Sequence, residues 1–527
     1  MEPFVRENSA RHRPHLPGLV LIVAILGLAF ILRMKFWGQP FEMDEGAHAY
    51  MGWGMLQGLV PYRDMYNGKP PGIYLIHALL FLVAEPTALN IKLFASIYTL
   101  GTTLAVYYVT RKIAGKKAGI AAALLFGIFS PGPKIQGGGV NSEVFMVLPY
   151  TLAALSLLKA LDQGKQKDYF LTGLWTGLAC TFKQVAGVNL FWVACYFLIR
   201  VGRIREGDRV SRITKDVLWV AAGATVPWLP FILYLYLNNA ISQFYYWQVG
   251  SGFAYMVAGH RGFSSLGLLL KQMKSTLGEN GILWLLALAG IVSGWKKYRH
   301  KPTADSKPEE QRRQQDAWIL MATWPFFSFI GVAAGGRYFA HYFIQLLPPL
   351  AVLSGAGLAD LIQKARADGF KIFRQPITLL VIVGFVLFIK TDIPYYFKYD
   401  EIQISMRQYG TPLFSVSRYI GKYLRAKTQP DDLVFVWAVN SEINFYALRK
   451  SPSPFVMHVN FETVPWDAYE EVMQSLHKAP PKYIVEMQPT LAFPALHQYV
   501  HKNYIAETSD DLDQLKLFIP FQLYRRK

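Results

Sequence analysis

The residues with the types and spacing of a reactive site gather in one polar stretch, residues 41–72 (FEMDEGAHAYMGWGMLQGLVPYRDMYNGKPPG). It begins with two adjacent carboxylates, Asp44 and Glu45, continues with Arg63, and ends with Lys69 before a pair of prolines. It follows the first long apolar segment of the chain. Ionisable groups this dense at the mouth of a membrane segment indicate a functional site rather than an ordinary solvated loop.

Three further polar groups occur at the ends of apolar segments. Glu143 precedes one segment, in NSEVF, and Lys183 interrupts another, in LACTFKQVAG. A lysine there is costly unless it meets an anion or a water-filled cavity, which favours a functional role over a side chain that only extends to the interface. Arg337, Tyr338 and His341 begin a third segment, and Arg337 and His341 would share a helix face if the helix started that early.

These acids and cations would share one cavity if the segments end on the same side of a membrane. An acid that accepts a proton, beside cations that bind a phosphate leaving group, is the arrangement that glycosyl transfer from a lipid phosphate requires. The candidates are Asp44, Glu45 and Glu143 as catalytic acids and Arg63, Lys69, Lys183, Arg337, Tyr338 and His341 as substrate-binding residues.

The composition is that of a polytopic membrane protein, with 52% hydrophobic and 17% charged residues among 527. A net charge of +19 could indicate nucleic acid, but the basic residues lie in short clusters between apolar segments, so we expect no nucleic-acid partner. Cys180 and Cys195 lie inside apolar segments, and no GxxxxGK[ST] phosphate loop occurs. We therefore expect no metal site and no cofactor.

The fold class that follows is an α-helical membrane protein with about eleven transmembrane helices. The candidate spans begin near Pro17, Ala88, Ala118, Val144, Phe170, Ala186, Val217, Ile282, Ala317, Phe343 and Pro376. Residues 73–84 are too short for the ~20 residues of a span and follow the proline pair, which predicts a helix along the interface instead. With that helix excluded, 26 Lys and Arg fall on the side of the N-terminus and 9 on the other, which predicts a cytoplasmic N-terminus.

The sequence changes character after Lys390, where strand-like pieces alternate with helical stretches. LVFVWAV from Leu433, YIVEM from Tyr483 and KLFIP from Lys516 are typical of strands, and TVPWDAYEEVMQSLHKA from Thr463 is typical of a helix. We expect a transmembrane domain over residues 1–391, with a catalytic first loop at about 38–88, and a small α/β domain over 392–527 on the same outer face.

The motifs together resemble a known family. DEGAHAY from Asp44, VPYRDMYNGKPPG from Val60, NSEVFMVLPY from Asn141, TFKQ from Thr181 and GGRYFAHYFIQLLPPLA from Gly335 are similar to the bacterial branch of the C-type glycosyltransferase superfamily. That branch is related to protein O-mannosyltransferases, lipid A aminoarabinose transferases and rhizobial lipopolysaccharide galacturonosyltransferases. The resemblance covers roughly residues 16–390 and implies the fold of that superfamily.

The resemblance also implies an activity. It implies a polyprenyl-phosphate sugar donor, an envelope acceptor (a glycolipid, lipopolysaccharide or protein) and an inverting transfer on the periplasmic face of the bacterial inner membrane. A first-loop acid as catalytic base maps onto Asp44, and a donor-phosphate contact maps onto Lys69. Glu45 or Glu143 could share the acid role. The GGRYFAHYF residues Arg337, Tyr338 and His341 would line the same cavity.

Two other classes of function compete with this one. A transporter or flippase of lipid-linked sugars would also place charges within spans, but the paired inverted repeats and matching broken helices typical of transporters are not found in the sequence. A structural scaffold for the C-terminal domain would not explain a charge such as Lys183 inside a span. The glycosyltransferase hypothesis accounts for both observations.

Overall fold

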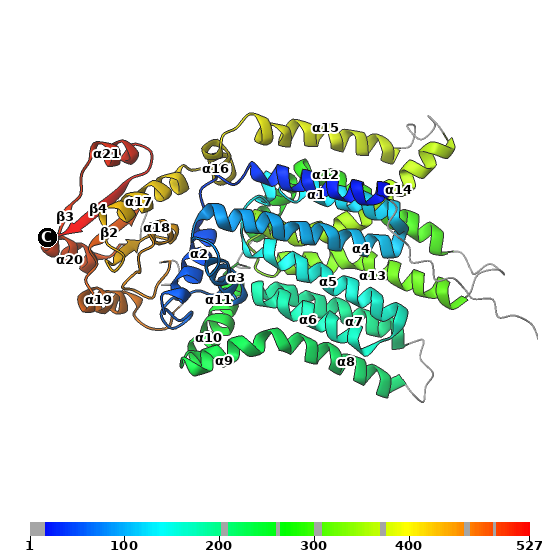
Figure 1. Cartoon of the computed structure of the whole chain (residues 1–527), viewed down its shortest axis with the longest axis horizontal. Coiled ribbons are helices and arrows are strands. Elements are labelled where there is room, and N and C mark those ends of the chain that lie inside the picture. The colour runs from blue at the N-terminus through cyan, green and yellow to red at the C-terminus, as the bar shows by residue number, and fades with distance from the viewer. Residues whose placement is uncertain are drawn as a thin grey trace, which may run out of the picture.

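The computed structural model describes residues 16–201, 209–259, 264–299, 308–368, 376–457, 464–487 and 492–527. Long helices run side by side through the body of the molecule, and a smaller mixed unit lies at one end (Figure 1). The helices of the body are α1 (Leu16–Met34), α4 (Ala88–Phe129), α5 (Ser142–Gln163), α6 (Gln166–Phe182), α7 (Val188–Val201), α8 (Arg209–Thr225), α9 (Leu229–Leu237), α12 (Ser264–Arg299), α13 (Pro308–Ala333), α14 (Leu347–Asp368) and α15 (Pro376–Phe397).

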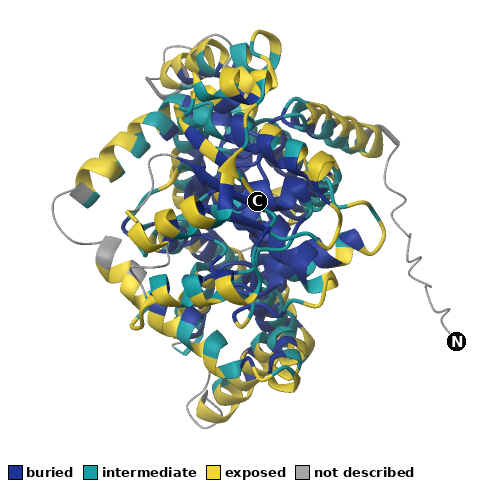
Figure 2. Cartoon of the chain, turned by 90° about the vertical axis from the view of Figure 1, so that its left-hand side faces the viewer, coloured by how far each residue is buried: buried dark blue, intermediate teal, exposed yellow. Residues whose placement is uncertain are grey.

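Eight helical stretches among the described residues are long and apolar enough to cross a membrane. Large apolar side chains are exposed along the outer helices, for example Val20 (64%) on α1 and Val386 (56%) on α15. Buried residues fill the middle of the molecule and exposed ones the outer helices (Figure 2). An apolar surface of this extent is one that lipid would cover, so the prediction of a polytopic membrane protein is confirmed.

Helix α4 contains two of the predicted spans. Its path turns at Gly115, where φ is +86° and ψ is 175°, a conformation that glycine adopts without steric cost. Beyond the turn, Gly119 lies against Tyr107 and Arg111, and Ala123 packs in one cluster with Tyr107. The two halves therefore run antiparallel, as the expected spans from Ala88 and Ala118 require.

Glycine residues allow the backbones of α6 and α8 to pack closely against each other. A Cβ atom on Gly173 of α6 would lie 1.9 Å from the Val220 carbonyl oxygen of α8, and one on Gly177 would lie 2.1 Å from the Ala224 oxygen. Backbones can approach this closely only without side chains, which is the usual device of membrane helix pairs. The same packing positions the C-terminal end of α6, after which Lys183 follows.

The first polar stretch folds as two short helices with a loop between them, α2 (Met43–Leu56) and α3 (Gly72–Phe81). Helix α3 is the short helix expected after the proline pair. Short helical elements also line this end of the molecule: η1 (Pro133–Ile135), η2 (Gln184–Gly187), η4 (Val226–Trp228), α10 (Ile241–Tyr245), η5 (Tyr246–Gly250), α11 (Ser251–Gly259) and η6 (Ala340–Leu346).

The C-terminal unit carries a four-stranded mixed sheet with strand order β1-β2-β4-β3. Its elements are α16 (Glu401–Tyr409), α17 (Leu413–Lys427), β1 (Val434–Trp437), α18 (Glu442–Ala447), α19 (Ala468–Lys478), β2 (Tyr483–Met487), α20 (Pro494–Asn503), β3 (Tyr504–Ala506), α21 (Asp510–Lys516) and β4 (Phe521–Arg526). Strands β1 and β2 are parallel, with Val434 opposite Tyr483, whereas β4 runs antiparallel to β2 and β3.

The prediction of a strand at KLFIP is wrong. Lys516 ends α21, and the strand begins only at Phe521. Asp510, Asp511 and Asp513 in the first turn of α21, capped by the Ser509 hydroxyl, favour a helix here. The other two expected strands correspond to β1 and β2, and the expected helix corresponds to α19.

The C-terminal unit is docked on the first polar stretch. The backbone N–H of Phe41 donates to the Tyr446 hydroxyl at 2.9 Å, and the Tyr66 N–H donates to the Pro454 oxygen at 2.7 Å. Arg418 donates to the Gly38 oxygen at 2.6 Å. Since these contacts join segments more than three hundred residues apart, the loop and the unit form one surface at the same end of the molecule (Figure 1).

Candidate active site

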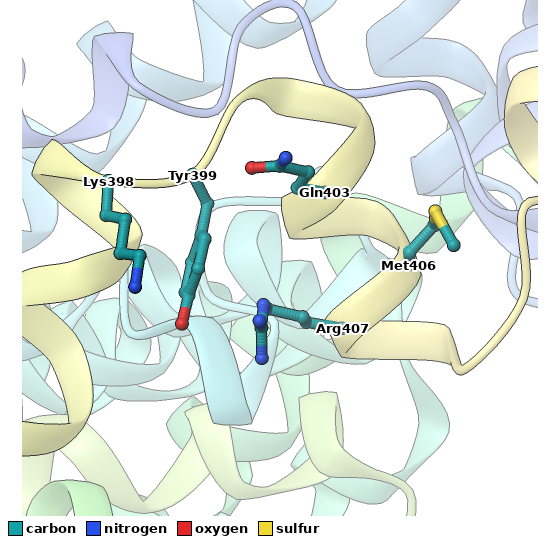
Figure 3. A pocket seen from close by; sticks show the side chains of 5 residues that line it. All are labelled: Lys398, Tyr399, Gln403, Met406 and Arg407. Carbon is teal, nitrogen blue, oxygen red and sulfur yellow. The ribbon is translucent and has the colours of Figure 1, made fainter.

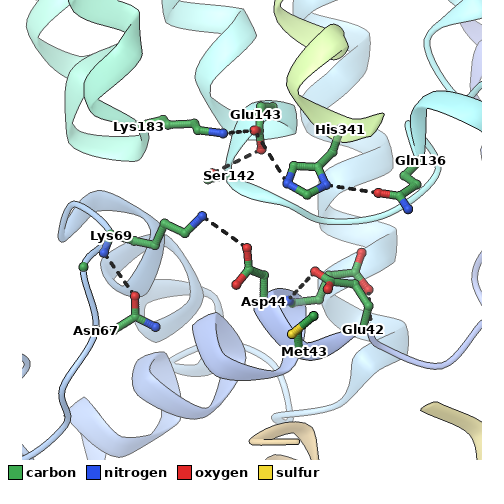
Figure 4. A network of polar contacts seen from close by, with 12 residues as sticks. Glu42, Met43, Asp44, Asn67, Lys69, Gln136, Ser142, Glu143, Lys183 and His341 are labelled. Atoms are coloured by element: carbon green, nitrogen blue, oxygen red, sulfur yellow. Dashed lines mark hydrogen bonds and ion pairs between the residues drawn. The ribbon is translucent and has the colours of Figure 1, made fainter. Parts of the chain in front are cut away.

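Asp44 lies in the first turn of α2, whose N-terminus is closed by a capping box. The Glu42 carboxylate accepts the Glu45 N–H at 3.1 Å, and the Glu45 carboxylate accepts the Glu42 N–H at 3.1 Å. Asp44 takes no part in the cap, so its side chain is free to point away from the helix. Its Oδ2 lies 3.1 Å from Nζ of Lys69 (Figure 4). With 21% of the Asp44 side chain and 22% of that of Lys69 exposed, both remain reachable.

Four hydrogen bonds hold the backbone of Lys69. Its carbonyl oxygen accepts hydrogen bonds from the hydroxyls of Tyr62 (2.8 Å) and Tyr74 (3.1 Å) and from the Gln248 amide (2.8 Å). Its N–H donates to the Asn67 side chain at 3.1 Å. Such support fixes where the flexible lysine side chain starts, and therefore which space its ammonium group can reach.

A second ion pair lies beside the first. Lys183 follows α6 with extended backbone, and its Nζ donates to Glu143 at the start of α5. Glu143 is 1% exposed and also accepts the Ser142 hydroxyl at 3.2 Å. The Lys183 ammonium lies 3.6 Å from the centre of the Tyr342 ring, so a buried cation meets both a carboxylate and an aromatic face.

His341 joins this second pair to a neighbouring loop. Its Nε2 lies 4.0 Å from a Glu143 oxygen, and its Nδ1 lies 3.0 Å from Oε1 of Gln136. Gln136 follows η1 and has a left-handed backbone conformation with φ of +56°. The site is thus built from the first polar stretch and from segments next to the ends of α4, α5, α6 and α14. Figure 4 shows the side chains of these segments close together.

The three acids at the start of α2 differ in the direction of their pKa shifts. Burial raises the pKa of Asp44, but the charge of Lys69 and the neighbouring His48 and His341 lower it more, so this pKa lies well below its usual range. Burial raises the pKa of Glu42 and of Glu45. Among these three acids, Asp44 is therefore the one whose surroundings favour the ionised form.

Glu45 has a structural role in addition to the cap. Its carboxylate accepts the Val140 N–H at 2.6 Å, and the residue is 2% exposed. It therefore ties α2 to the loop that carries Gln136. The far end of this loop is held in the same way, because Glu279 of α12 accepts the Lys134 N–H at 2.7 Å.

Arg63, a predicted site residue, belongs to a separate ion pair within the first polar stretch. Arg63 is an exposed side chain that pairs with Asp64 at 2.7 Å and donates to the Asn238 oxygen at 2.9 Å. Arg337 and His341 do not share a helix face, because η6 begins at Ala340, and Tyr338, with φ of +49°, interrupts any earlier helix. The expectation that Arg337 and His341 share a helix face is therefore wrong.

Sequence reasoning missed Gln136, Glu279 and His48. Gln136 lies in GPKIQGGG, and Glu279 lies in a different apolar segment. His48 is one helical turn after Asp44 and fully buried, and burial lowers its pKa to about 3. The spacing DxxxH on one helix face was the signal that could have identified it.

Two family models match separate parts of the chain. Residues 68–234 match the model described as dolichyl-phosphate-mannose-protein mannosyltransferase, a range that includes Lys69, Glu143 and Lys183 and begins after Asp44. Residues 416–527 match the model described as the C-terminal domain of a putative competence-induced protein, Ccs4. An uncharacterized protein of Aquifex aeolicus (strain VF5) is 26% identical over 178 residues, 32% of this chain. The match spans only 40% of that relative's length.

Solved structures resemble the chain over most of its length. ArnT from Cupriavidus metallidurans bound to undecaprenyl phosphate has a TM-score of 0.60 at 14% identity, covering 96% of this chain and 97% of ArnT. The oligosaccharyltransferase AglB from Archaeoglobus fulgidus, in complex with an inhibitory peptide and a dolichol-phosphate, has a TM-score of 0.55 at 14% identity, covering 90% of this chain and 69% of AglB. At these identities the likeness concerns the fold. The fold expected from the motifs is confirmed.

Proposed function

We propose that this chain, which has the C-type glycosyltransferase fold, is an inverting glycosyltransferase. It moves a sugar from a polyprenyl-phosphate donor to an acceptor in the cell envelope. The acceptor is a glycolipid, a lipopolysaccharide or a protein. The family match over residues 68–234 and the fold shared with ArnT and AglB support this reaction class. The observation that carries the proposal is the contact between Asp44 and Lys69 at the mouth of the helices.

The donor phosphate would bind between the two lysines. Lys69 and Lys183 are each paired with one carboxylate in the chain alone, so each pair is neutral overall. The donor phosphate, a diester with one negative charge, competes with Asp44 for the ammonium group as it approaches Lys69. The pKa of Asp44, which Lys69 holds down, then rises, and the carboxylate becomes a better base as the donor binds.

The chemical step needs only one carboxylate. The acceptor hydroxyl oxygen forms a bond to the anomeric carbon while the bond from that carbon to the phosphate oxygen breaks. The hydroxyl proton passes to Asp44, and the electron pair of the broken bond leaves with the polyprenyl phosphate, whose charge the lysines already balance. Attack from the face opposite the leaving group inverts the anomeric configuration.

Glu143 and His341 are better suited to orientation than to proton transfer. Glu143 is deeply buried and engaged by Lys183 and Ser142, so it holds the lysine in place. His341, fixed through Gln136, closes the same side of the site. Tyr338 and Arg337 precede η6, where they would meet a substrate that extends past His341.

We also propose the placement and division of the chain. The end that carries the first polar stretch and the sheet would face the periplasm, with the helices in the inner membrane, because the excess of Lys and Arg lies in the opposite connections. Residues 1–391 would be the transferase domain and 392–527 a periplasmic domain. That border falls inside α15, which continues to Phe397.

The proposed function can be tested in a deletion strain and with the purified protein. We expect mass spectrometry of envelope glycolipids and glycoproteins from the deletion strain to lack one sugar modification. Expression of the parent chain should restore it, and expression of Asp44→Asn should not. Loss of the modification together with lipid-linked sugar accumulated on the cytoplasmic face would support a flippase instead, and an unchanged envelope would contradict the proposal.

A further inference from the structure

A pocket lies apart from the two ion pairs, where the last membrane helix meets the C-terminal unit. Its cavity of about 500 Å³ is lined by Lys398, Tyr399, Gln403, Met406 and Arg407, from the end of α15 and from α16 (Figure 3). The sequence motifs did not point to these residues.

The lining of this pocket is cationic and aromatic. The Arg407 guanidinium lies 3.9 Å from the centre of the Tyr399 ring, and Lys398 Nζ lies 6.0 Å from the same centre. Neither cation forms an ion pair within the part of the chain that the structure describes. The nearby acid Asp400 is used as a helix cap, where it accepts the Gln403 N–H at 2.8 Å. The pocket therefore offers two positive charges to an anion.

The surroundings of the pocket are those of a membrane surface. Phe397, the last residue of α15, is 81% exposed, and on α16 Ile402 and Met406 are each 44% exposed. The opposite side of α16, with Ile404 and Ser405, is buried against the protein. Since α15 is one of the helices long enough to span a membrane, these exposed apolar side chains come at the level where a bilayer ends.

The pocket is connected to the loop of the candidate active site. Gln408, the neighbour of Arg407, donates to the Pro133 oxygen at 2.9 Å, and its side-chain oxygen accepts a hydrogen bond from Gln39. Pro133 begins η1, after which Gln136 contacts His341. Helix α16 thus has the pocket on one side and the active-site loop on the other.

We propose that this pocket binds the phosphate-bearing head group of an anionic lipid of the same membrane leaflet, at a site separate from the donor lysines. The two cations bind the phosphate, and the tyrosine ring and Met406 contact the glycerol or sugar next to it. The acyl chains lie along the exposed apolar residues of α15. This binding site does not depend on the reaction proposed above.

Native mass spectrometry of the purified full chain tests the proposal, with phosphatidic acid and phosphatidylcholine as probes. We expect phosphatidic acid to bind more tightly than phosphatidylcholine, and the double variant Lys398→Gln/Arg407→Gln to weaken it about tenfold. Gln403→Glu should also weaken it, because a carboxylate can still cap α16 but repels phosphate. Lys69 and Lys183 are intact in every variant, so the loss reports this pocket.

A matched control is Lys427→Gln. Lys427 is an exposed cation 5.5 Å from the Tyr423 ring on α17, and it lines no part of this pocket. It should leave the affinity for phosphatidic acid unchanged. Equal affinity for the two lipids, or parental affinity in the double variant, would overturn the proposal. Displacement of phosphatidic acid from the pocket by millimolar inorganic phosphate would assign the site to a soluble anion and would overturn the lipid assignment.

Discussion

The ammonium group of Lys69 lies 3.1 Å from the carboxylate of Asp44, although 25 residues separate them in the chain. One of the two belongs to the first turn of α2 and the other to the loop before α3. In the proposed reaction, Lys69 binds the phosphate and Asp44 accepts the proton, so this pair would connect the two roles. A substrate that engages one partner changes the chemistry of the other.

Replacement of Lys69 should therefore affect both affinity and pH dependence. A charge-assisted contact contributes roughly 1.5 to 3 kcal/mol, so Lys69→Gln should weaken donor use about ten- to a hundredfold. Because Lys69 lowers the pKa of Asp44 and burial raises it, the pKa should rise in the variant. The acid limb of kcat/KM should then move to higher pH.

The matched control for this experiment is Arg63→Gln, which removes an exposed cation of the same loop. Its pH profile should coincide with that of the parent. An acid limb that stays in place in Lys69→Gln would show that Asp44 is not the group whose ionisation limits the reaction.

The buried pair of Glu143 and Lys183 should behave as a unit in stability measurements. Removal of one partner leaves an uncompensated buried charge and costs roughly 3 to 5 kcal/mol. Glu143→Gln and Lys183→Met should each lower the midpoint of thermal unfolding, and the double variant should lose less than the two losses added together. Additive losses would mean that the two side chains are not coupled.

Glu442 should make the C-terminal unit less stable at alkaline pH. Burial raises its pKa to about 7 from an ordinary 4.5. Its contribution to stability is fully present below pH 4.5 and is lost as the pH rises through about 7, since the folded state must then hold a buried charge. Relative to the parent, Glu442→Gln should gain roughly 3 kcal/mol between pH 4.5 and pH 8.

Differential scanning fluorimetry across this pH range measures the effect, with Glu310→Gln, an exposed acid of α13, as the control. The parent and the control should lose unfolding temperature together as the pH rises. A Glu442→Gln curve parallel to theirs would contradict the raised pKa.

The orientation in the membrane can be tested with single cysteines. In a chain with Cys180 and Cys195 replaced by alanine, a cysteine at Arg63 should react with a membrane-impermeant thiol reagent in intact spheroplasts. A cysteine at Arg312, in one of the basic connections, should react only after lysis. The reverse pattern would invert the proposed topology.

The sequence predicted the membrane helices, and it predicted that several of the candidate residues come together, because both depend on local signals. Span length, the proline pair and the charge of Lys183 are readable in one segment, and Asp44, Lys69, Glu143, Lys183 and His341 do lie in one region. The shared helix face of Arg337 and His341 failed because the left-handed backbone of Tyr338 delays the helix. Nothing in the pattern RYFAH indicates that turn.

The contacts that hold the site together were not predictable from local pattern. Glu45 looked like a second catalytic acid, but its carboxylate accepts the Val140 N–H, 95 residues away. Glu279 and Gln136 act on the same loop from other segments. Such roles depend on which segments the fold brings together, and hydrophobic periodicity does not contain that information.

Asp44→Asn tests the proposed reaction most directly, assayed with a purified chain, a defined polyprenyl-phosphate sugar and a defined acceptor. Asparagine keeps the size and the hydrogen bonding of the side chain but cannot accept the proton, so turnover should fall by about 10² to 10⁴ while donor binding stays near the parental level. Glu45→Gln and Glu143→Gln should each reduce turnover less. Product from the parent should have the anomeric configuration opposite to that of the donor. Near-parental turnover in Asp44→Asn, or a product with retained configuration, would contradict the role of Asp44 as the base of an inverting transfer.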